Sequence, residues 1–298
     1  MKRPHWIRAK APSGANYNEV RRLVESARLN TVCRSANCPN VGECWAARTA
    51  TFMILGNTCT RNCRFCAVSS GEPEPLDADE PRRVAGAVAY LNLRHAVITS
   101  VTRDDLPDGG AAAFAETIRS IRALLPDCSV EALIPDFEGA EQSLRTVIDA
   151  EPDILNHNIE TVERCYQEVR PQAIYYRSVE LLRRAKLMAP AIRTKSGLMV
   201  GVGETREEIL QAMRDLRRAG CDILTIGQYL APSPRHLPVV RYYNPDEFDD
   251  LRRVGLEMGF GYIESGPLVR SSYHAAEQAV STGRLNKSMG KNPEDPSA

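Results

Sequence analysis

The sequence predicts an α/β fold, a partial (β/α)6 TIM-like barrel with an extension at each end of the chain. From Thr51 onward, short β-rich runs alternate with helical patterns, as in βα units around a parallel sheet. The length of 298 residues suits one large α/β domain with appendages, or two small domains. We expect an N-terminal extension over residues 1–50, the barrel over 51–261 and a C-terminal extension over 262–298.

The N-terminal extension starts with a basic segment that contains Pro and Gly. Apolar residues at helical spacing then predict a helix between Asn16 and Leu29. After it, Cys33, Cys38 and Cys44 form a C-x4-C-x5-C run, which we call the first triplet. The Asn, Pro and Gly residues of this run favour a loop, and a loop lets three sulfur atoms converge where a helix or strand of this spacing would not.

The barrel region is expected to contain six strands and six helices. The predicted strands are short runs bounded by turn residues: Thr51–Leu55, Ala96–Val101, Ser129–Ile134, Asp153–Asn156, Thr194–Val200 and Asp222–Gln228. The predicted helices have apolar residues at helical spacing: Asp79–Leu91, Ala111–Leu125, Glu138–Ala150, Ser178–Met188, Glu204–Arg218 and Pro245–Met258. A last strand is predicted at Tyr262–Val269, and the polar tail from Gly283 is expected to fray.

Composition gives no reason to expect a nucleic-acid or membrane partner. The chain has 38 basic and 38 acidic residues, with 43% hydrophobic and 26% charged residues, as in ordinary globular proteins. No segment approaches the roughly eighteen consecutive apolar residues of a membrane span, and the N-terminus lacks the apolar core of a secretory signal. We therefore expect a cytoplasmic protein.

Cysteine usage indicates metal ligation and argues against a disulfide framework. Six of the nine cysteines lie between Cys33 and Cys66, and the total is odd. The three scattered cysteines, Cys128, Cys165 and Cys221, are expected to be small buried hydrophobic residues.

Cys59, Cys63 and Cys66 form a C-x3-C-x2-C loop, the second triplet, directly after the first predicted barrel strand. Three thiolates can bind three irons of a 4Fe–4S cluster, which normally has four cysteine ligands. The fourth iron is then open to a ligand that is not protein. A zinc site and a disulfide loop are the alternatives, but structural zinc usually takes a closed set of ligands from two C-x2-4-C pairs.

The second triplet, with the aromatic Phe65 before its last cysteine, resembles the signature of the radical S-adenosylmethionine (SAM) superfamily. The resemblance implies that Cys59, Cys63 and Cys66 hold a cluster whose open iron binds the amino and carboxylate groups of SAM. It also agrees with the partial barrel, which is the usual fold of that superfamily.

Polar strand ends supply the remaining expected SAM contacts. By the same resemblance, Asn158 and Glu160 contact the ribose, and Met199 stands in a Gly197–Glu204 run near the adenine, in place of the usual Ile. The Thr102–Gly110 run would lie near the SAM amino group. Several polar residues have plainer alternative interpretations as turn residues, a core histidine or a helix-start acid: Asp104, Asp105, His157 and Glu204.

The two triplets, the Arg-Ser-Ser-Tyr run that ends at Tyr273 and the N-terminal segment 4–10 together resemble the lipoyl synthase family over nearly the whole chain. The resemblance implies a radical SAM sulfurtransferase that inserts two sulfur atoms at C6 and C8 of an octanoyl chain attached to a lysine of a lipoyl carrier domain. SAM is cleaved to 5′-deoxyadenosine and methionine, and the implied cofactors are SAM and two 4Fe–4S clusters. No protein side chain is expected to act as a catalytic acid or base.

The resemblance further implies that Cys33, Cys38 and Cys44 hold an auxiliary cluster, which donates the sulfur. We assign Ser272 as its fourth ligand, with Ser271 as the fallback and a simple turn serine as the alternative. A hard alkoxide binds iron less tightly than a thiolate, which suits a cluster that is broken down.

The implied partners are octanoylated carrier domains and a low-potential electron donor. The carriers would be 2-oxoacid dehydrogenase E2 subunits or the glycine cleavage H protein, and the donor a ferredoxin or flavodoxin. Arg103 and Lys195 are candidates for holding the carrier peptide at the barrel mouth.

Two other interpretations remain open. Another radical SAM enzyme, such as a methylthiotransferase or a biotin-synthase-like enzyme, would explain the barrel and the second triplet but neither the first triplet nor Arg-Ser-Ser-Tyr. A two-cluster electron carrier or a zinc-structured binding module would need no barrel of this length.

Overall fold

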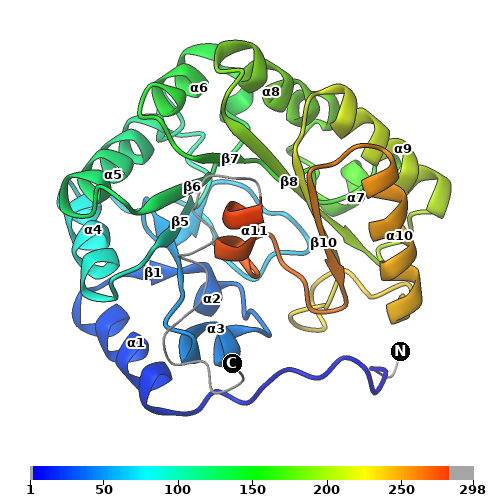
Figure 1. Cartoon of the computed structure of the whole chain (residues 1–298), viewed down its shortest axis with the longest axis horizontal. Coiled ribbons are helices and arrows are strands. Elements are labelled where there is room, and N and C mark those ends of the chain that lie inside the picture. The colour runs from blue at the N-terminus through cyan, green and yellow to red at the C-terminus, as the bar shows by residue number, and fades with distance from the viewer. Residues whose placement is uncertain (1–2, 282–298) are drawn as a thin grey trace.

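The structure, a computed structural model, describes residues 3–281. Its centre is an eight-stranded sheet in the order β1-β2-β5-β6-β7-β8-β9-β10, which curves around a common axis with helices on its outer side (Figure 1). Its strands are β1 Asn30–Thr31, β2 Thr51–Ile54, β5 His95–Ser100, β6 Ser129–Leu133, β7 Ile154–Asn156, β8 Arg193–Val200, β9 Ile223–Gln228 and β10 Tyr262–Gly266. A separate pair consists of β3 Thr58–Cys59 and β4 Ser69–Ser70.

The helices cover the outer face of the sheet and the N-terminal edge. The longer ones are α1 Ala15–Ser26, α4 Glu80–Tyr90, α5 Ala111–Leu124, α6 Glu141–Ile148, α8 Tyr175–Met188, α9 Arg206–Arg218 and α10 Pro245–Glu257. The shorter ones are α2 Val32–Ser35, α3 Val41–Ala46, α7 Tyr166–Val169, α11 Ala275–Ser281 and the 3-10 helices η1 Phe137–Gly139 and η2 Glu163–Cys165.

The strand pairing confirms the predicted partial barrel. Every neighbouring pair from β2 to β10 is parallel, and β1 pairs antiparallel with β2. The order leaves β1 and β10 as edges, so the barrel is open between them. The six predicted barrel strands agree with the observed ones to within one residue at each end. Their residues are buried almost throughout, as expected for strands covered by helices on one side and lumen side chains on the other.

Local signals explain where the helices of the second half begin. In α9, the Thr205 side chain accepts a hydrogen bond from the Glu208 N–H, and the Glu208 carboxylate accepts one from the Thr205 N–H. Asn244 and Glu247 form the same capping box at α10. Each box satisfies two backbone N–H groups that the helix itself leaves unpaired, so these helix starts are fixed by the sequence.

The first triplet does not lie in a plain loop, so that prediction is wrong. Cys33 lies in α2 and Cys44 in α3, with Cys38 in the turn between them. The Thr31 hydroxyl accepts a bond from the Arg34 N–H at 3.4 Å and caps α2. Each of these short helices carries one cysteine, and the third lies in the connection between them. The chain changes direction in that connection, so the three cysteines lie near one another.

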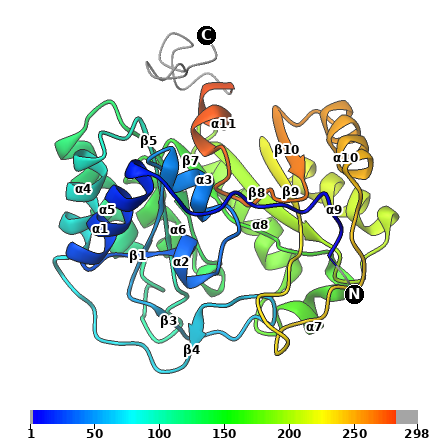
Figure 2. The same cartoon turned by 90° about the horizontal axis from the view of Figure 1, so that it is seen from below.

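The chain after β10 turns back along the open side of the barrel. The predicted last strand to Val269 is too long, because the Val269 N–H bonds to the Gly266 carbonyl and makes a turn. The helix α11 then lies at the end of the barrel opposite to β3 and β4 (Figure 2). There its Ala279 packs with Ile154, Ile223 and Tyr262, which lie at the starts of β7, β9 and β10. The predicted fraying tail from Gly283 lies outside the described residues.

Between residues 3 and 281, no helix has both the length and the apolar character needed to cross a bilayer.

Candidate metal centre

The second triplet lies at the carboxyl ends of the barrel strands. Cys59 ends β3, which follows β2, and β3 pairs in parallel with β4. The Gly71 N–H donates to the Cys59 carbonyl and the Cys66 N–H to the Cys63 carbonyl, both at 3.0 Å, so the loop is compact. In α/β barrels this end of the sheet is where catalytic groups gather.

The sulfur of Cys59 is held by the end of β5. It accepts backbone hydrogen bonds from Arg61 at 3.4 Å and from Thr102 at 3.3 Å. The Thr60 N–H and hydroxyl both donate to the Thr102 carbonyl at 3.0 Å. The first cysteine of the loop is therefore fixed to a neighbouring strand before any metal binds.

Arg61 connects the loop to the end of β5 and to the end of β6. Its side chain is 4% exposed and donates to Asp104 at 2.6 and 2.8 Å and to Asp136 at 2.7 Å. Burial alone would raise the pKa of Asp136, but the hydrogen bond and charge of Arg61 lower it to about 2. Asp104 and Asp105 are thus more than turn residues, since Asp104 anchors this loop and Asp105 pairs with Arg103 at 2.7 Å.

The three thiols of the second triplet lie close enough to influence one another. Burial, and after it the charges of Cys63 and Cys59, raise the pKa of Cys66 to about 12. Burial also raises the pKa of Cys63, with Cys59 adding to the effect. Iron must displace these protons, because thiolates are the ligands.

The first triplet forms a second such group. Burial raises the pKa of Cys33 to about 11, and Cys38 adds to the shift. Burial followed by the charges of Cys33 and Cys38 raises the pKa of Cys44 to about 12. Within each set of three cysteines that the spacing predicted, the thiols therefore lie near enough for their charges to act on one another.

The Arg-Ser-Ser-Tyr run lies against the first triplet. Burial lowers the pKa of Arg270, while the nearby charges of Cys38 and Glu160 raise it. Burial raises the pKa of Tyr273 to about 12, with Cys44 among the further causes. Asn40, between the same cysteines, donates to the Leu268 carbonyl at 2.7 Å. Ser271 and Ser272 lie between these contacts and are both half-buried.

The predicted SAM contacts gather beside the second triplet. Asn158 donates to the Glu160 carboxylate at 3.0 Å, and the Met199 N–H donates to the Glu160 carbonyl at 2.9 Å. A side chain at Gly197 would come within 2.6 Å of the Asn158 Oδ1, so the strand needs glycine here. Phe65 and Met199 pack against the same hydrophobic cluster. Glu160 also raises the pKa of the nearby cysteines of this triplet.

Buried polar atoms at this site suit a polar ligand. Among the described residues, the His157 Nε2, Asn158 Oδ1 and Arg170 Nε atoms have no hydrogen-bond partner. Arg170 lies beside the loop, because its charge lowers the pKa of Cys63. Burial lowers the pKa of His157 to about 4, and its Nδ1 lies 2.8 Å from the Ile134 carbonyl oxygen, so this histidine is buried but only half satisfied. Unpaired donors and acceptors next to an incomplete cysteine set fit SAM, which carries an ammonium, a carboxylate and ribose hydroxyls.

Two anchors of the cysteine loop were not predicted from the sequence. The Arg64 N–H donates to the Val169 carbonyl at 2.9 Å, and the Asn62 N–H donates to the Gln172 side chain at 2.7 Å. Arg170, between these residues, donates to the Asn158 carbonyl at 2.9 Å. The one signal in the sequence for these anchors is Arg170, which stands directly before a proline at the end of a short helix. That pattern is too common to predict a contact with the cysteine loop.

The structure gives Lys195, Arg103 and Glu204 other roles than those considered from the sequence. Lys195 is 0% exposed and bonds to Glu131 at 2.9 Å inside the barrel, so it does not hold a carrier peptide at the mouth. Arg103 is likewise buried and engaged by Asp105. Glu204 precedes α9, and its carboxylate accepts from the N–H groups of the two residues that follow Val200, at 2.6 and 2.9 Å.

The cysteines give no support to the disulfide alternative. All nine are free, and Cys128, Cys165 and Cys221 are buried as predicted. No three described His, Cys, Asp or Glu side chains converge on one point as ligands of a single ion do. Cubane ligands bind separate irons of one cluster.

Comparisons with known proteins agree with this geometry. Residues 53–228 match the family model described as the radical SAM superfamily. The chain is 60% identical to the lipoyl synthase of Rubrobacter xylanophilus, over 95% of this chain and 88% of that one. This chain belongs to the lipoyl synthase family. The lipoyl synthase of Koribacter versatilis is also 60% identical, over 94% of this chain and 92% of that one. As a family member the chain is a radical SAM enzyme, with SAM and 4Fe–4S clusters as its cofactors.

Solved structures show the same fold at low sequence identity. The HydG maturase of the [FeFe]-hydrogenase superposes with a TM-score of 0.56 at 17% identity, covering 77% of this chain and 54% of that one. Streptococcus suis SuiB bound to S-adenosylmethionine gives 0.53 at 9% identity, covering 89% of this chain and 55% of that one. These similarities bear on the barrel alone.

Proposed function

We propose that this lipoyl synthase inserts two sulfur atoms at C6 and C8 of an octanoyl chain held on a lysine of a carrier domain. One observation carries the proposal. The segment that leads to Arg270 accepts a hydrogen bond from Asn40 of the first triplet at 2.7 Å, and the charges of both Cys38 and Glu160 act on the pKa of Arg270, so this segment lies near both cysteine groups. A chain of eight carbons that reacts at one group and receives sulfur from the other needs both groups at one place.

The two triplets take different roles in this proposal. Cys59, Cys63 and Cys66 hold the SAM cluster, with the fourth iron left for SAM. The chemistry that the bound groups supply is reductive cleavage of SAM to a carbon-centred radical and donation of sulfide. The protein's task is to bind and orient the reactants and to exclude water, which a radical on an unactivated carbon requires.

The auxiliary cluster is assigned to the first triplet and one serine. Cys33, Cys38 and Cys44 provide three thiolates, and Ser272 provides the alkoxide, with Ser271 as the alternative. The position of the Arg-Ser-Ser-Tyr run against Cys38 and Cys44 supports a ligand from this segment.

The SAM contacts are assigned to the group around Glu160. Its carboxylate, oriented by Asn158, would accept from the ribose hydroxyls. Met199 and Phe65 would provide apolar surface for the adenine, since both pack on one cluster at the same side of the barrel. Planar bases bind well between apolar side chains and backbone polar groups.

The partners follow from the reaction. The carriers are octanoylated domains, from 2-oxoacid dehydrogenase E2 subunits or the glycine cleavage H protein. A ferredoxin or flavodoxin supplies low-potential electrons, and the reaction takes place in the cytoplasm. The balance of 38 basic and 38 acidic residues gives no overall field for steering, so recognition of the carrier depends on local contacts at the barrel mouth.

The test is a single-turnover reaction. The anaerobically reconstituted protein is incubated with SAM, a low-potential reductant and an octanoyl-lysine peptide, and peptide mass, 5′-deoxyadenosine, iron and sulfide are measured. We expect the peptide to gain two sulfur atoms while one cluster per chain is lost. Formation of 5′-deoxyadenosine with an unmodified peptide would contradict sulfur insertion, and a protein that never cleaves SAM would contradict the assignment of the second triplet.

A further inference from the structure

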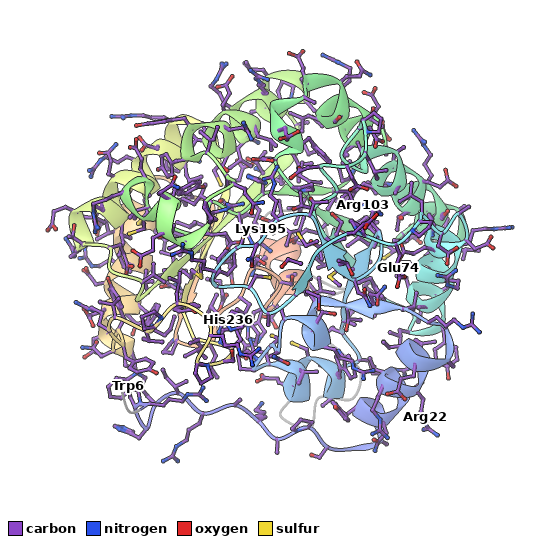
Figure 3. The ribbon with its side chains drawn as sticks, turned by 180° about the vertical axis from the view of Figure 1, so that it is seen from behind. Trp6, Arg22, Glu74, Arg103, Lys195 and His236 are labelled. Carbon is purple, nitrogen blue, oxygen red and sulfur yellow. The ribbon has the colours of Figure 1, made fainter. Side chains whose placement is uncertain are left out.

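We infer that His236 is a positioning residue for the SAM cluster, which fixes the third cysteine of the second triplet through its carbonyl. The His236 Nε2 lies 3.0 Å from the Cys66 carbonyl oxygen, although 170 residues separate the two in the chain. The Nδ1 of the same ring lies 2.9 Å from the Ser233 Oγ. Figure 3 shows His236 from the barrel end that carries the cysteine loop. The inference rests on the proposed function, since it takes Cys66 as an iron ligand.

The hydrogen-bond partners show which ring nitrogen of His236 donates to Cys66. A carbonyl oxygen only accepts, so the Nε2 atom of His236 carries the proton donated to Cys66. The Ser233 Oγ, which contacts the Nδ1 atom, also accepts from the Arg235 N–H at 3.2 Å, so the backbone fixes its position. The His236 N–H donates to the Ser233 carbonyl at 3.1 Å and closes the turn. Contacts on both ring nitrogens therefore hold the ring in one orientation.

The segment that carries His236 is itself fixed. The next residue, Leu237, is 9% exposed, and its N–H donates to the Arg64 carbonyl at 3.2 Å. Its carbonyl accepts from the Tyr229 hydroxyl at 2.8 Å, directly after β9. Two consecutive residues thus bind two carbonyls of the cysteine loop. A rigid segment is needed for this task, because a mobile one would transmit its own motion to the loop.

This contact fixes Cys66, whereas the other anchors described above act on residues 59 to 64 of the loop. Cys59 and Arg61 are fixed to the ends of β5 and β6, on the β2 side of the sheet. His236 reaches Cys66 from β9, four places beyond β5 in the strand order. A cubane needs its three thiolates at set separations, so the last cysteine must be as well placed as the first. Residues that orient metal ligands in this way commonly change metal affinity or activity by about 10- to 100-fold when mutated.

The experiment isolates one cluster in the full-length protein. A host variant with Cys33, Cys38 and Cys44 replaced by Ala keeps the second triplet alone. In this host we compare His236→Ala, His236→Gln, Ser233→Ala and, as a matched control at an exposed histidine, His5→Ala. Iron retention under a chelator and the change of the reduced-cluster EPR spectrum on adding SAM are measured, and circular dichroism of the metal-free proteins reports the fold.

We expect His236→Ala to lose iron about tenfold faster or more than the host and to show a weakened EPR response to SAM. Gln places an amide N–H near the position of the His Nε2 donor, so His236→Gln is expected to restore most of both properties. Ser233→Ala should lose iron at a rate between those of the host and His236→Ala, because it keeps the His236 donor but removes the contact that orients the ring. His5→Ala should match the host.

The inference is overturned if His236→Ala retains iron and responds to SAM like the host. It is also overturned if His236→Gln, folded by circular dichroism, is as defective as His236→Ala, since the donor would then not be the reason. A host that itself binds no cluster or gives no response to SAM is a different result, because it contradicts the proposed role of the second triplet.

Discussion

Replacing Arg61 with Lys should loosen the cysteine loop while keeping its positive charge. The Arg61 guanidinium makes three hydrogen bonds, two to Asp104 at 2.6 and 2.8 Å and one to Asp136 at 2.7 Å. A lysine ammonium is a compact donor that cannot reproduce the planar fork. The side chains of Arg61 and Asp136 are 4% and 0% exposed, and that of Asp104 is 26% exposed, so water replaces the lost bonds at most on the Asp104 side.

The magnitude follows from the number of bonds lost. We expect lysine to keep one of the three. Hydrogen bonds to charged groups contribute about 1.5–3 kcal/mol each, so two of them amount to about 3 kcal/mol or more. That free energy corresponds to roughly two orders of magnitude in the population of the closed loop. Because cluster release requires the loop to open, iron loss from Arg61→Lys should be about 10- to 100-fold faster.

The assay is iron retention under a chelator in the host variant that lacks the first triplet, with Arg103→Lys as the matched control. Arg103 is also buried and also binds an aspartate through its fork, but that partner, Asp105, makes no contact with the cysteine loop in the described structure. If Arg61→Lys and Arg103→Lys lose iron at the same rate, the loop is not held by the Arg61 bonds and the reasoning fails.

Four further predictions concern the rest of the molecule. Cys38→Ala should halve the iron content, from about eight to about four per chain, and stop sulfur insertion while SAM is still cleaved, as measured by iron assay and product mass. Lys195→Met removes the cation that pairs with the buried Glu131 carboxylate, which keeps only polar contacts such as the Asn156 amide at 2.8 Å, and should lower the free energy of unfolding by about 3 kcal/mol, whereas Lys195→Met with Glu131→Leu should be closer to neutral in urea titrations of metal-free protein. The ion pair of Asp136, whose pKa is lowered to about 2, should contribute about 2 kcal/mol in full above roughly pH 4. That contribution is lost as the pH falls through 2, so acid titrations of the metal-free wild type and Asp136→Asn should converge there. Gly227→Ala places a Cβ 2.0 Å from the Val269 carbonyl oxygen and so displaces the segment that leads to Arg-Ser-Ser-Tyr. It should weaken the auxiliary cluster but not the SAM cluster, as followed by iron content and EPR.

The sequence predicted the barrel well because each of its signals is local. A run such as Ala96–Val101 shows its β-branched residues within a few positions, and the helix that follows shows its spacing within three turns. The helices α2 and α3, with four and six residues, are too short to display a period. Cysteine spacing still identified their ligands, because it required no knowledge of the backbone between them.

The sequence could not predict contacts that depend on strand register or that join segments far apart in the chain. Lys195 was expected at the barrel mouth as a polar side chain for the carrier peptide, but it pairs with Glu131, on a strand two places away in the sheet. Likewise, nothing around His236 indicates that it reaches Cys66. Polar side chains far apart in the chain leave no pattern that reveals their pairing.

The open edge of the barrel explains why residues from opposite ends of the chain meet at the first triplet. A sheet that does not close leaves two edge strands, and these edges must be covered. The N-terminal extension leads into β1 at one edge, and the C-terminal segment follows β10 at the other. Trp6 donates to the Tyr243 carbonyl at 3.3 Å, and Asn40 donates to the Leu268 carbonyl at 2.7 Å, so each extension binds the opposite side of the gap. A ligand set drawn from both extensions is therefore assembled by the same contacts that cover the edges, and it forms only when the whole chain is folded.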